Sequence, residues 1–151
     1  MRKIHNAYYA GIFDGEGTVA LHPNTMRGKK HKTYQVVVQV INTNEWLCQQ
    51  LCFSFGGAVG IHRRANDRCK QIFHWYASGK SAHQFLLIIL PYSHLKRPQI
   101  ELALQFIAHK KHGRIYSEKY FDIESDFKHF MLKLNQRGSV MQTQEVVRHE
   151  D

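Results

Sequence analysis

Alternating hydrophobic and polar positions predict four β-strands that pair as two hairpins. Residues 18–22 and 34–42 alternate as strands do, and the second of these segments is rich in valine. The residues between them, 23–33, are basic and rich in turn formers, as expected of a hairpin connection. A second hairpin is predicted from strands at residues 58–64 and 69–77, joined by a turn at residues 65–68.

Helical spacing of apolar residues predicts five helices around these strands. The first begins near His5 or Asn6 and is ended by Gly15 and Gly17, because glycine commonly follows the last turn of a helix. Thr43 is the expected N-cap of the second helix. The other four helices are predicted at residues 44–55, 81–90, 95–112 and 117–134.

The predicted order is α-β-β-α-β-β-α followed by two further helices. This is an α+β layout, in which helices cover one face of an antiparallel sheet. A length of 151 residues suits one domain with a substantial core. We expect a single domain over residues 1–135 and a polar C-terminal tail over residues 136–151.

The charge of the chain indicates a polyanionic partner. It has 21 Lys and Arg residues against 12 Asp and Glu, a formal net charge of +9, which favours nucleic acid over an anionic membrane. No apolar run approaches the roughly 20 residues of a membrane-spanning helix, and no signal peptide is expected. Three cysteines without a framework spacing favour a reducing, intracellular compartment, with bacterial or phage cytoplasm and an organelle fitting equally.

Residues 8–17, YYAGIFDGEG, differ from an ordinary core helix. Ala10 and Gly11 form a small pair in mid-helix, where Gly costs about 1 kcal/mol relative to Ala, so another backbone is expected to approach closely there. Asp14 and Glu16 lie at the C-terminal end of the helix, where the helix dipole disfavours anions. A bound cation would remove that penalty. The alternative is a simple Ala-Gly helix followed by an acidic turn.

Residues 9–17 resemble the LAGLIDADG signature of homing endonucleases, with Tyr9 for the leading Leu, Gly15 for the second Ala and Glu16 for the final Asp. The element order resembles the single-motif form of that fold over about residues 5–135. The resemblance implies a site-specific, intron-encoded endonuclease that hydrolyses both strands of a long, nearly palindromic DNA site.

The single motif also implies a homodimer, because members of this size pack two motif helices at a symmetry axis. The interface is expected to contain Tyr9, Ala10, Gly11 and Phe13.

The resemblance also implies the catalytic groups. Glu16 is the expected metal ligand, with the Gly15 carbonyl and Asp14 as further ligands, although that Asp position is often structural in the family. Oxygen ligands suit Mg²⁺, with Mn²⁺ or Ca²⁺ as substitutes for binding. Asn44 is expected to orient the attacking water and Lys96 to stabilise charge; a helix-capping Asn and a solvated Lys are the alternatives. Cys48 stands where many relatives have a basic residue.

Strand alternation predicts a DNA-binding face on the sheet, opposite a core face of Val19, Leu21, Val36, Val38 and Val40. Gln and Arg recognise adenine and guanine edges, whereas Lys in loops mainly contacts phosphates. The alternative is a solvated polar face. The predicted DNA-binding residues are His22, Asn24, Arg27, Lys29, Lys30, Lys32, Gln35, Val37, Gln39, His62, Arg64, Lys70, Ile72 and His74.

Two other functions use the same basic surface. One is an RNA maturase that assists the splicing of its host intron; the other is a DNA-binding regulator on a degenerate nuclease scaffold. Retention of Glu16 and Lys96 favours cleavage over both. A zinc site from Cys48 and Cys52 with Cys69 or His74 is less favoured, because the spacing fits no standard finger.

Overall fold

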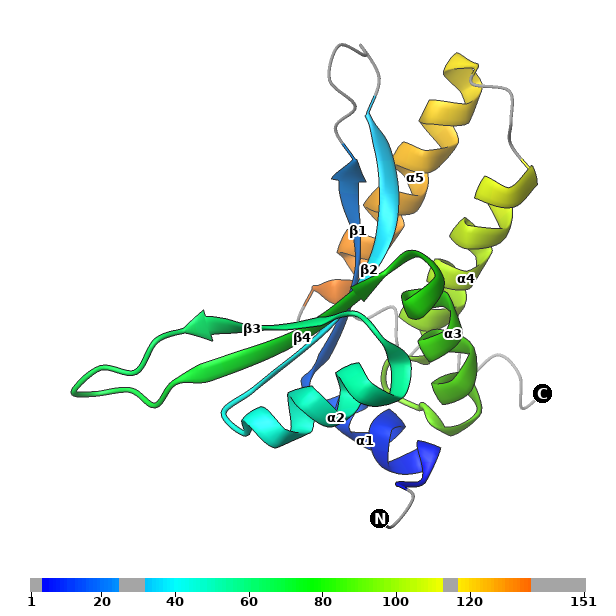
Figure 1. Ribbon diagram of the computed structural model, residues 1–151. Coiled ribbons are helices and arrows are strands. Elements are labelled where there is room, and N and C mark those ends of the chain that lie inside the picture. Colours follow the sequence, from blue (N-terminus) through cyan, green and yellow to red (C-terminus); the bar gives the residue numbers. More distant parts are fainter. Residues whose placement is uncertain (1–3, 25–31, 113–116, 137–151) are drawn as a thin grey trace.

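The computed structural model describes residues 4–24, 32–112 and 117–136. Its elements follow the predicted order, with a four-stranded antiparallel sheet and helices packed on one of its faces (Figure 1). The α+β fold class is therefore confirmed. The elements are α1 (Asn6–Glu16), β1 (Gly17–Asn24), β2 (Thr33–Asn42), α2 (Glu45–Phe55), β3 (Ala58–Arg63), β4 (Ile72–Ser78), α3 (Gly79–Ile89), a short 3₁₀ helix η1 (Leu90–Tyr92), α4 (Arg97–His112) and α5 (Glu118–Asn135).

The strand order β1-β2-β4-β3 places both hairpins in one sheet, with β2 and β4 at its centre. The first hairpin pairs Gly17 with Val40 and Asn24 with Thr33. The second is shorter than predicted, since β4 begins at Ile72 and not at residue 69. Asn66 and Cys69 exchange backbone hydrogen bonds of 3.0 and 3.2 Å in the connection, so these residues form an isolated bridge instead of extending the strand.

The valine-rich face of the sheet is the core face, as the alternation predicted. Val19, Leu21, Val36, Val38 and Val40 are all buried. Side chains alternate between the two faces of a strand, so this assignment places the intervening residues on the open face.

Aromatic rings fix α1 against the sheet and the neighbouring helices. The ring of Tyr9 lies 5.0 Å from that of Phe55 on α2, and Phe13 lies 5.1 Å from Phe85 on α3. Trp75 of β4 lies 4.9 Å from the same Phe85 ring. Edge-to-face pairs at these distances add to the stabilisation from burial. These contacts fix the position of α1, the helix that contains the motif, against α2 and α3.

Helix α5 covers β1, which is an edge strand. Lys128 Nζ donates to the Leu21 carbonyl at 2.7 Å, and Asn135 Nδ2 donates to the Val19 carbonyl at 2.8 Å. These bonds occupy backbone groups that an edge strand otherwise leaves open. They also bring the C-terminal end of α5 close to the start of β1. Within the described residues, no helix is both long and apolar enough to cross a membrane.

Candidate active site

Glu16 lies where α1 passes directly into β1, with no intervening loop. Gly17 makes this junction possible, because a Cβ at this position would lie 2.2 Å from the Phe13 ring. The Glu16 side chain is exposed at the junction. Its backbone and that of Gly15 belong to the last turn of the helix, whose carbonyls have no intrahelical donors. The fold therefore presents a carboxylate and open carbonyl groups at one point.

A polar pocket of about 620 Å³ surrounds this junction. Glu16 and Lys96 line the same pocket, although they are 80 positions apart in the sequence. Among the described residues, no hydrogen bond or ion pair engages the Lys96 ammonium. The other residues that line the pocket are Asp14, Gly15, Gly17, Thr18, Ile41, Leu95, Gln99, Leu134, Asn135 and Gln136.

Asp14 makes the contacts of a structural residue, one of the two roles that the sequence left open. Its carboxylate accepts backbone hydrogen bonds from His94 (2.7 Å), Leu95 (3.2 Å) and Lys96 (3.0 Å), and a side-chain bond from Ser93. Both oxygens are thereby used to hold the turn before α4. These contacts give Asp14 a structural role, because they fix the backbone at Lys96.

The electrostatics of Asp14 agree with this role. Burial by itself raises the pKa of the carboxyl, but the hydrogen bonds from His94, Ser93, Lys96 and Leu95 outweigh it, so the net pKa of Asp14 lies below its ordinary value. Donors that bond to a carboxylate favour its charged form. The group is therefore held as an anion by the turn that it caps.

Asn42, which sequence reasoning did not select, contacts Glu16 directly. Asn42 Nδ2 donates a hydrogen bond to Glu16 Oε2, and Asn42 Oδ1 accepts one from the Asn44 backbone N–H at 2.8 Å. Asn44 itself, and not Thr43, is the N-cap residue of α2, yet its side chain makes no capping hydrogen bond. The only sequence signal for Asn42 was its position at the end of the second strand.

Cys48 lies behind Glu16 in the core and not in the pocket. Burial raises the pKa of its thiol, and the nearby Glu16 and Glu45 carboxylates act in the same direction against backbone hydrogen bonds from Trp75 and Asn42. A buried thiol of raised pKa stays protonated and is a poor metal ligand. In the described residues all three cysteines are free, and no three His, Cys, Asp or Glu side chains cluster as a metal cage.

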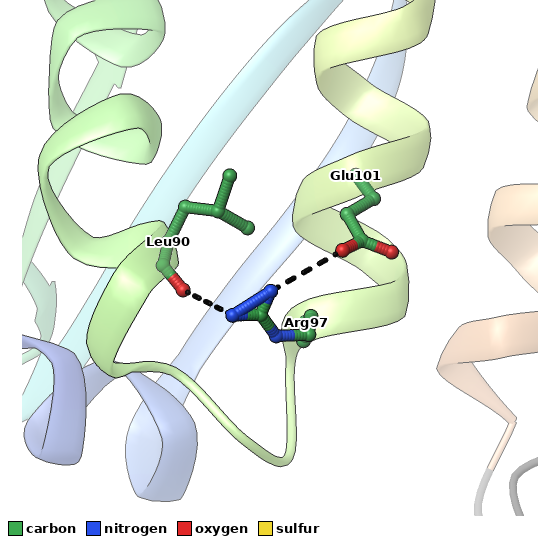
Figure 2. Close-up of polar contacts among 3 residues, drawn as sticks. All are labelled: Leu90, Arg97 and Glu101. Atoms are coloured by element: carbon green, nitrogen blue, oxygen red, sulfur yellow. Dashed lines mark hydrogen bonds and ion pairs between the residues drawn. The ribbon is translucent and has the colours of Figure 1, made fainter. Parts of the chain in front are cut away.

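Arg97, the residue after Lys96, is not available to the pocket. Figure 2 shows its guanidinium between the Leu90 carbonyl (3.3 Å) and the Glu101 carboxylate (3.4 Å). The Leu90 contact ties the start of α4 to the junction of α3 and η1, whereas the Glu101 contact lies within α4. Together with the Asp14 bonds, they leave Lys96 as the cation of this turn that faces the pocket.

The motif helix exposes a different face from the one predicted for a dimer interface. Tyr9, Ala10 and Phe13 are buried in the core of the single chain, which corrects the expectation for these three residues. Gly11 is exposed, and a Cβ at Gly11 or Gly15 would meet no atom within 4 Å. In a helix Gly11 and Gly15 lie one turn apart on one face, so the exposed stripe of α1 contains both.

The open face of the sheet carries polar side chains on β1, β2 and β4, with Val37 among them. His22 lies opposite Gln35, and Gln39 lies opposite Tyr76. The exposed Tyr76 was not predicted; its alternation with buried Trp75 and Ala77 was the signal that could have identified it. His22, Asn24, Lys32, Gln35, His62, Arg64 and Lys70 are exposed, Val37, Gln39, Ile72 and His74 are partly buried, and Arg27, Lys29 and Lys30 lie outside the described residues.

The donor set fits a hard divalent cation. A carboxylate and backbone carbonyls at an open pocket are the ligands that Mg²⁺ prefers, and Mg²⁺ commonly binds one or two protein carboxylates together with substrate phosphates. Among the described residues that line the pocket, Glu16 and Asp14 carry the carboxylates, and Glu16 has one oxygen bonded to Asn42. The pocket therefore offers the kind of ligands that would hold part of a metal site.

The chain has the fold of the LAGLIDADG homing endonucleases. I-CvuI, solved in complex with the I-CreI target, aligns over 87% of this chain and 82% of its own with a TM-score of 0.71 and 21% identity. The archaeal intron-encoded endonuclease I-Vdi141I, complexed with DNA, aligns over 88% of this chain and 85% of its own with a TM-score of 0.70 and 12% identity.

A longer relative shows the same unit as part of a larger chain. I-GzeII, a LAGLIDADG homing endonuclease in complex with its DNA target, aligns over 97% of this chain but only 50% of its own, with a TM-score of 0.62 and 15% identity. No protein-family model matches the sequence, and a search of curated proteins finds no match. At these identities the likeness establishes the fold.

Proposed function

We propose that this protein is a homodimeric, Mg²⁺-dependent, site-specific endonuclease that cuts both strands of a long, nearly palindromic DNA site. The observation that supports this most directly is the pocket at the end of α1, where Glu16 and Lys96 face the same space. A carboxylate that holds a metal and an ammonium that offsets phosphate charge both assist phosphodiester hydrolysis.

The sheet supports the DNA-binding part of the proposal. Its helix-free face presents Gln35 opposite His22 and Gln39 opposite Tyr76, and the chain has a formal net charge of +9. A polar, antiparallel surface of this kind fits the major groove, where Gln can make two hydrogen bonds to adenine. The neighbours solved with DNA have the same fold, which agrees with this assignment.

The dimer is supported by the open face of α1. Gly11 and Gly15 leave space for a second helix to approach closely, and Tyr8 and Leu95 are large apolar residues exposed at 48% and 68%. This chain also matches half of I-GzeII, so two copies would supply the equivalent of that longer chain. A two-fold axis along the glycine face brings the two Glu16 residues toward each other. Such a pair of carboxylates requires a cation between them.

Each polar residue of the pocket has a separate role in the proposed reaction. When bound, the divalent cation lowers the pKa of a water molecule and stabilises charge on the scissile phosphate. Glu16 holds the cation, with the carbonyl of Gly15 available beside it. Lys96 adds positive charge at the phosphate, and the Asp14 cap keeps its backbone in place.

The test is cleavage of a randomised DNA library in the presence of Mg²⁺, followed by sequencing of the cut ends. A single recurring site with near two-fold symmetry is expected. Glu16→Gln should abolish cutting while DNA binding and melting temperature are retained, because it removes the charge that holds the cation without changing the size of the side chain. Cutting by Glu16→Gln at the wild-type rate would refute the metal assignment. Specific binding without cutting by the wild type would instead identify a DNA-binding regulator.

A further inference from the structure

We propose that Asn42 positions the Glu16 carboxylate for metal binding, by bridging it to Asn44, the N-cap residue of α2. The inference rests on the proposed nuclease function and adds a residue to it. Asn42 is the last residue of β2, where it is paired with Phe73 of β4, and it is partly buried. Its backbone is therefore fixed by the centre of the sheet and not by a loop.

The orientation of the Asn42 amide follows from its partners. The Asn44 backbone N–H lies 2.8 Å from Asn42 Oδ1, and only an acceptor can face this donor. The amide nitrogen must then point the other way, where it donates to Glu16 Oε2. The bridge thus has a fixed direction, from the start of α2 through Asn42 to Glu16.

An amide is well suited to this position. It orients the carboxylate with an N–H donor but adds no positive charge, so it does not compete with a cation for Glu16. Among the described residues, no hydrogen bond engages the second carboxylate oxygen, Oε1, which leaves it open toward the pocket. Groups that hold metal ligands in place are typically worth 10–100-fold in metal affinity or activity. A Glu side chain has several rotatable bonds, so a hydrogen bond that holds its carboxylate reduces the conformational entropy lost when a metal binds.

A purely structural role for Asn42 makes a different prediction. If Asn42 served only to accept the Asn44 N–H, its Oδ1 would be sufficient and its amide nitrogen would have no effect. Asn42→Asp separates the two roles, because it keeps an acceptor for Asn44 but places a carboxylate oxygen beside Glu16. Asn42→Ala removes both bonds. Thr43→Ala is the matched control, since Thr43 is the exposed residue between Asn42 and Asn44.

The experiment measures Mn²⁺ binding by electron paramagnetic resonance on the full chain, alone and with the DNA site recovered from the library. Cleavage rate against Mg²⁺ concentration is a second readout. We expect Asn42→Ala to raise the Mn²⁺ Kd about tenfold or more. Asn42→Asp should tighten Mn²⁺ binding several-fold, because a cation relieves the repulsion between adjacent carboxylates. Thr43→Ala should bind Mn²⁺ like the wild type.

A wild-type Mn²⁺ Kd for Asn42→Asp would overturn the inference, whatever the effect of Asn42→Ala, because it would leave only the acceptor role. Glu16→Gln tests the proposed function separately in the same assay. If Glu16→Gln loses Mn²⁺ binding and Asn42→Asp does not change it, the metal assignment stands and the role of Asn42 falls. If Glu16→Gln binds Mn²⁺ normally, or the wild type binds none with or without DNA, the proposed metal site itself is wrong.

Discussion

Replacing Asp14 with alanine tests whether the acidic residue in the middle of the motif supports the fold or the metal. The structure has its carboxylate accepting four hydrogen bonds from residues 93–96, which precede α4. If this description is right, Asp14→Ala should lower stability but leave the metal ligand Glu16 in place. If Asp14 were a metal ligand, the substitution should weaken metal binding with little effect on unfolding.

The size of the effect can be estimated from the exposure of each donor. The amides of His94 and Leu95 belong to exposed residues and can turn to water, so loss of these hydrogen bonds should cost about 0.5–1.5 kcal/mol. Ser93 is fully buried, and its hydroxyl loses its partner, which costs about a further 1–3 kcal/mol. A loss of roughly 2–4 kcal/mol corresponds to a fall in melting temperature of about 5–15 °C for a chain of this size.

Thermal unfolding followed by circular dichroism checks this estimate, and pH provides an internal control. The folded-state pKa of Asp14 lies below its ordinary value of 3.8. Its stabilising contribution is therefore complete above that value and is lost as the pH falls through the lower folded-state pKa. The difference in melting temperature between wild type and Asp14→Ala should be full at pH 7 and should shrink below about pH 4.

Two outcomes would refute the capping role. One is an Asp14→Ala variant that melts with the wild type at pH 7. The other is a difference in melting temperature that is the same at pH 3 as at pH 7. Glu16→Gln is the matched control, because it also removes one negative charge from the end of α1 but should not lower the melting temperature.

Two further predictions concern assembly and DNA recognition. Gly11→Leu should leave the fold of one chain intact, since a Cβ at Gly11 meets nothing within 4 Å. It should yield monomers in analytical ultracentrifugation, because the leucine side chain fills the proposed helix interface. A monomeric wild type, even on DNA, would contradict the proposed dimer. Gln35→Ala should relax the base preference at one base pair in each half-site, at a cost of about 1–3 kcal/mol in binding free energy, with the salt dependence of binding nearly unchanged. Lys32→Ala should weaken binding to all DNA sequences alike and lower the slope of log affinity against log salt concentration by about 1 unit. A binding profile over all single-base variants of the site tests both, and a uniform loss of affinity for Gln35→Ala would mean that this residue does not contact a base edge.

The sequence determined the elements and the core face of the sheet, because both depend on local patterns. Val36, Val38 and Val40 share one face of the strand, so burying that face buries three valines and leaves only Val37 on the other. The helix that ends at Glu16 is likewise local, since Gly17 must follow it for the chain to pass the Phe13 ring. The motif therefore indicated both the fold and the residue that faces the pocket.

Tertiary structure alone decided the roles of the polar residues around Glu16. Asp14 and Glu16 are two positions apart, so they point about 200° apart around the helix axis. Which of them meets solvent depends on where residues 93–96 pack, and that segment lies far along the chain. The sequence spacing of Asn42 and Asn44 likewise does not show which amide reaches Glu16. The pairing of β2 with β4 decides which amide reaches Glu16, because it places Asn42 beside the end of α1.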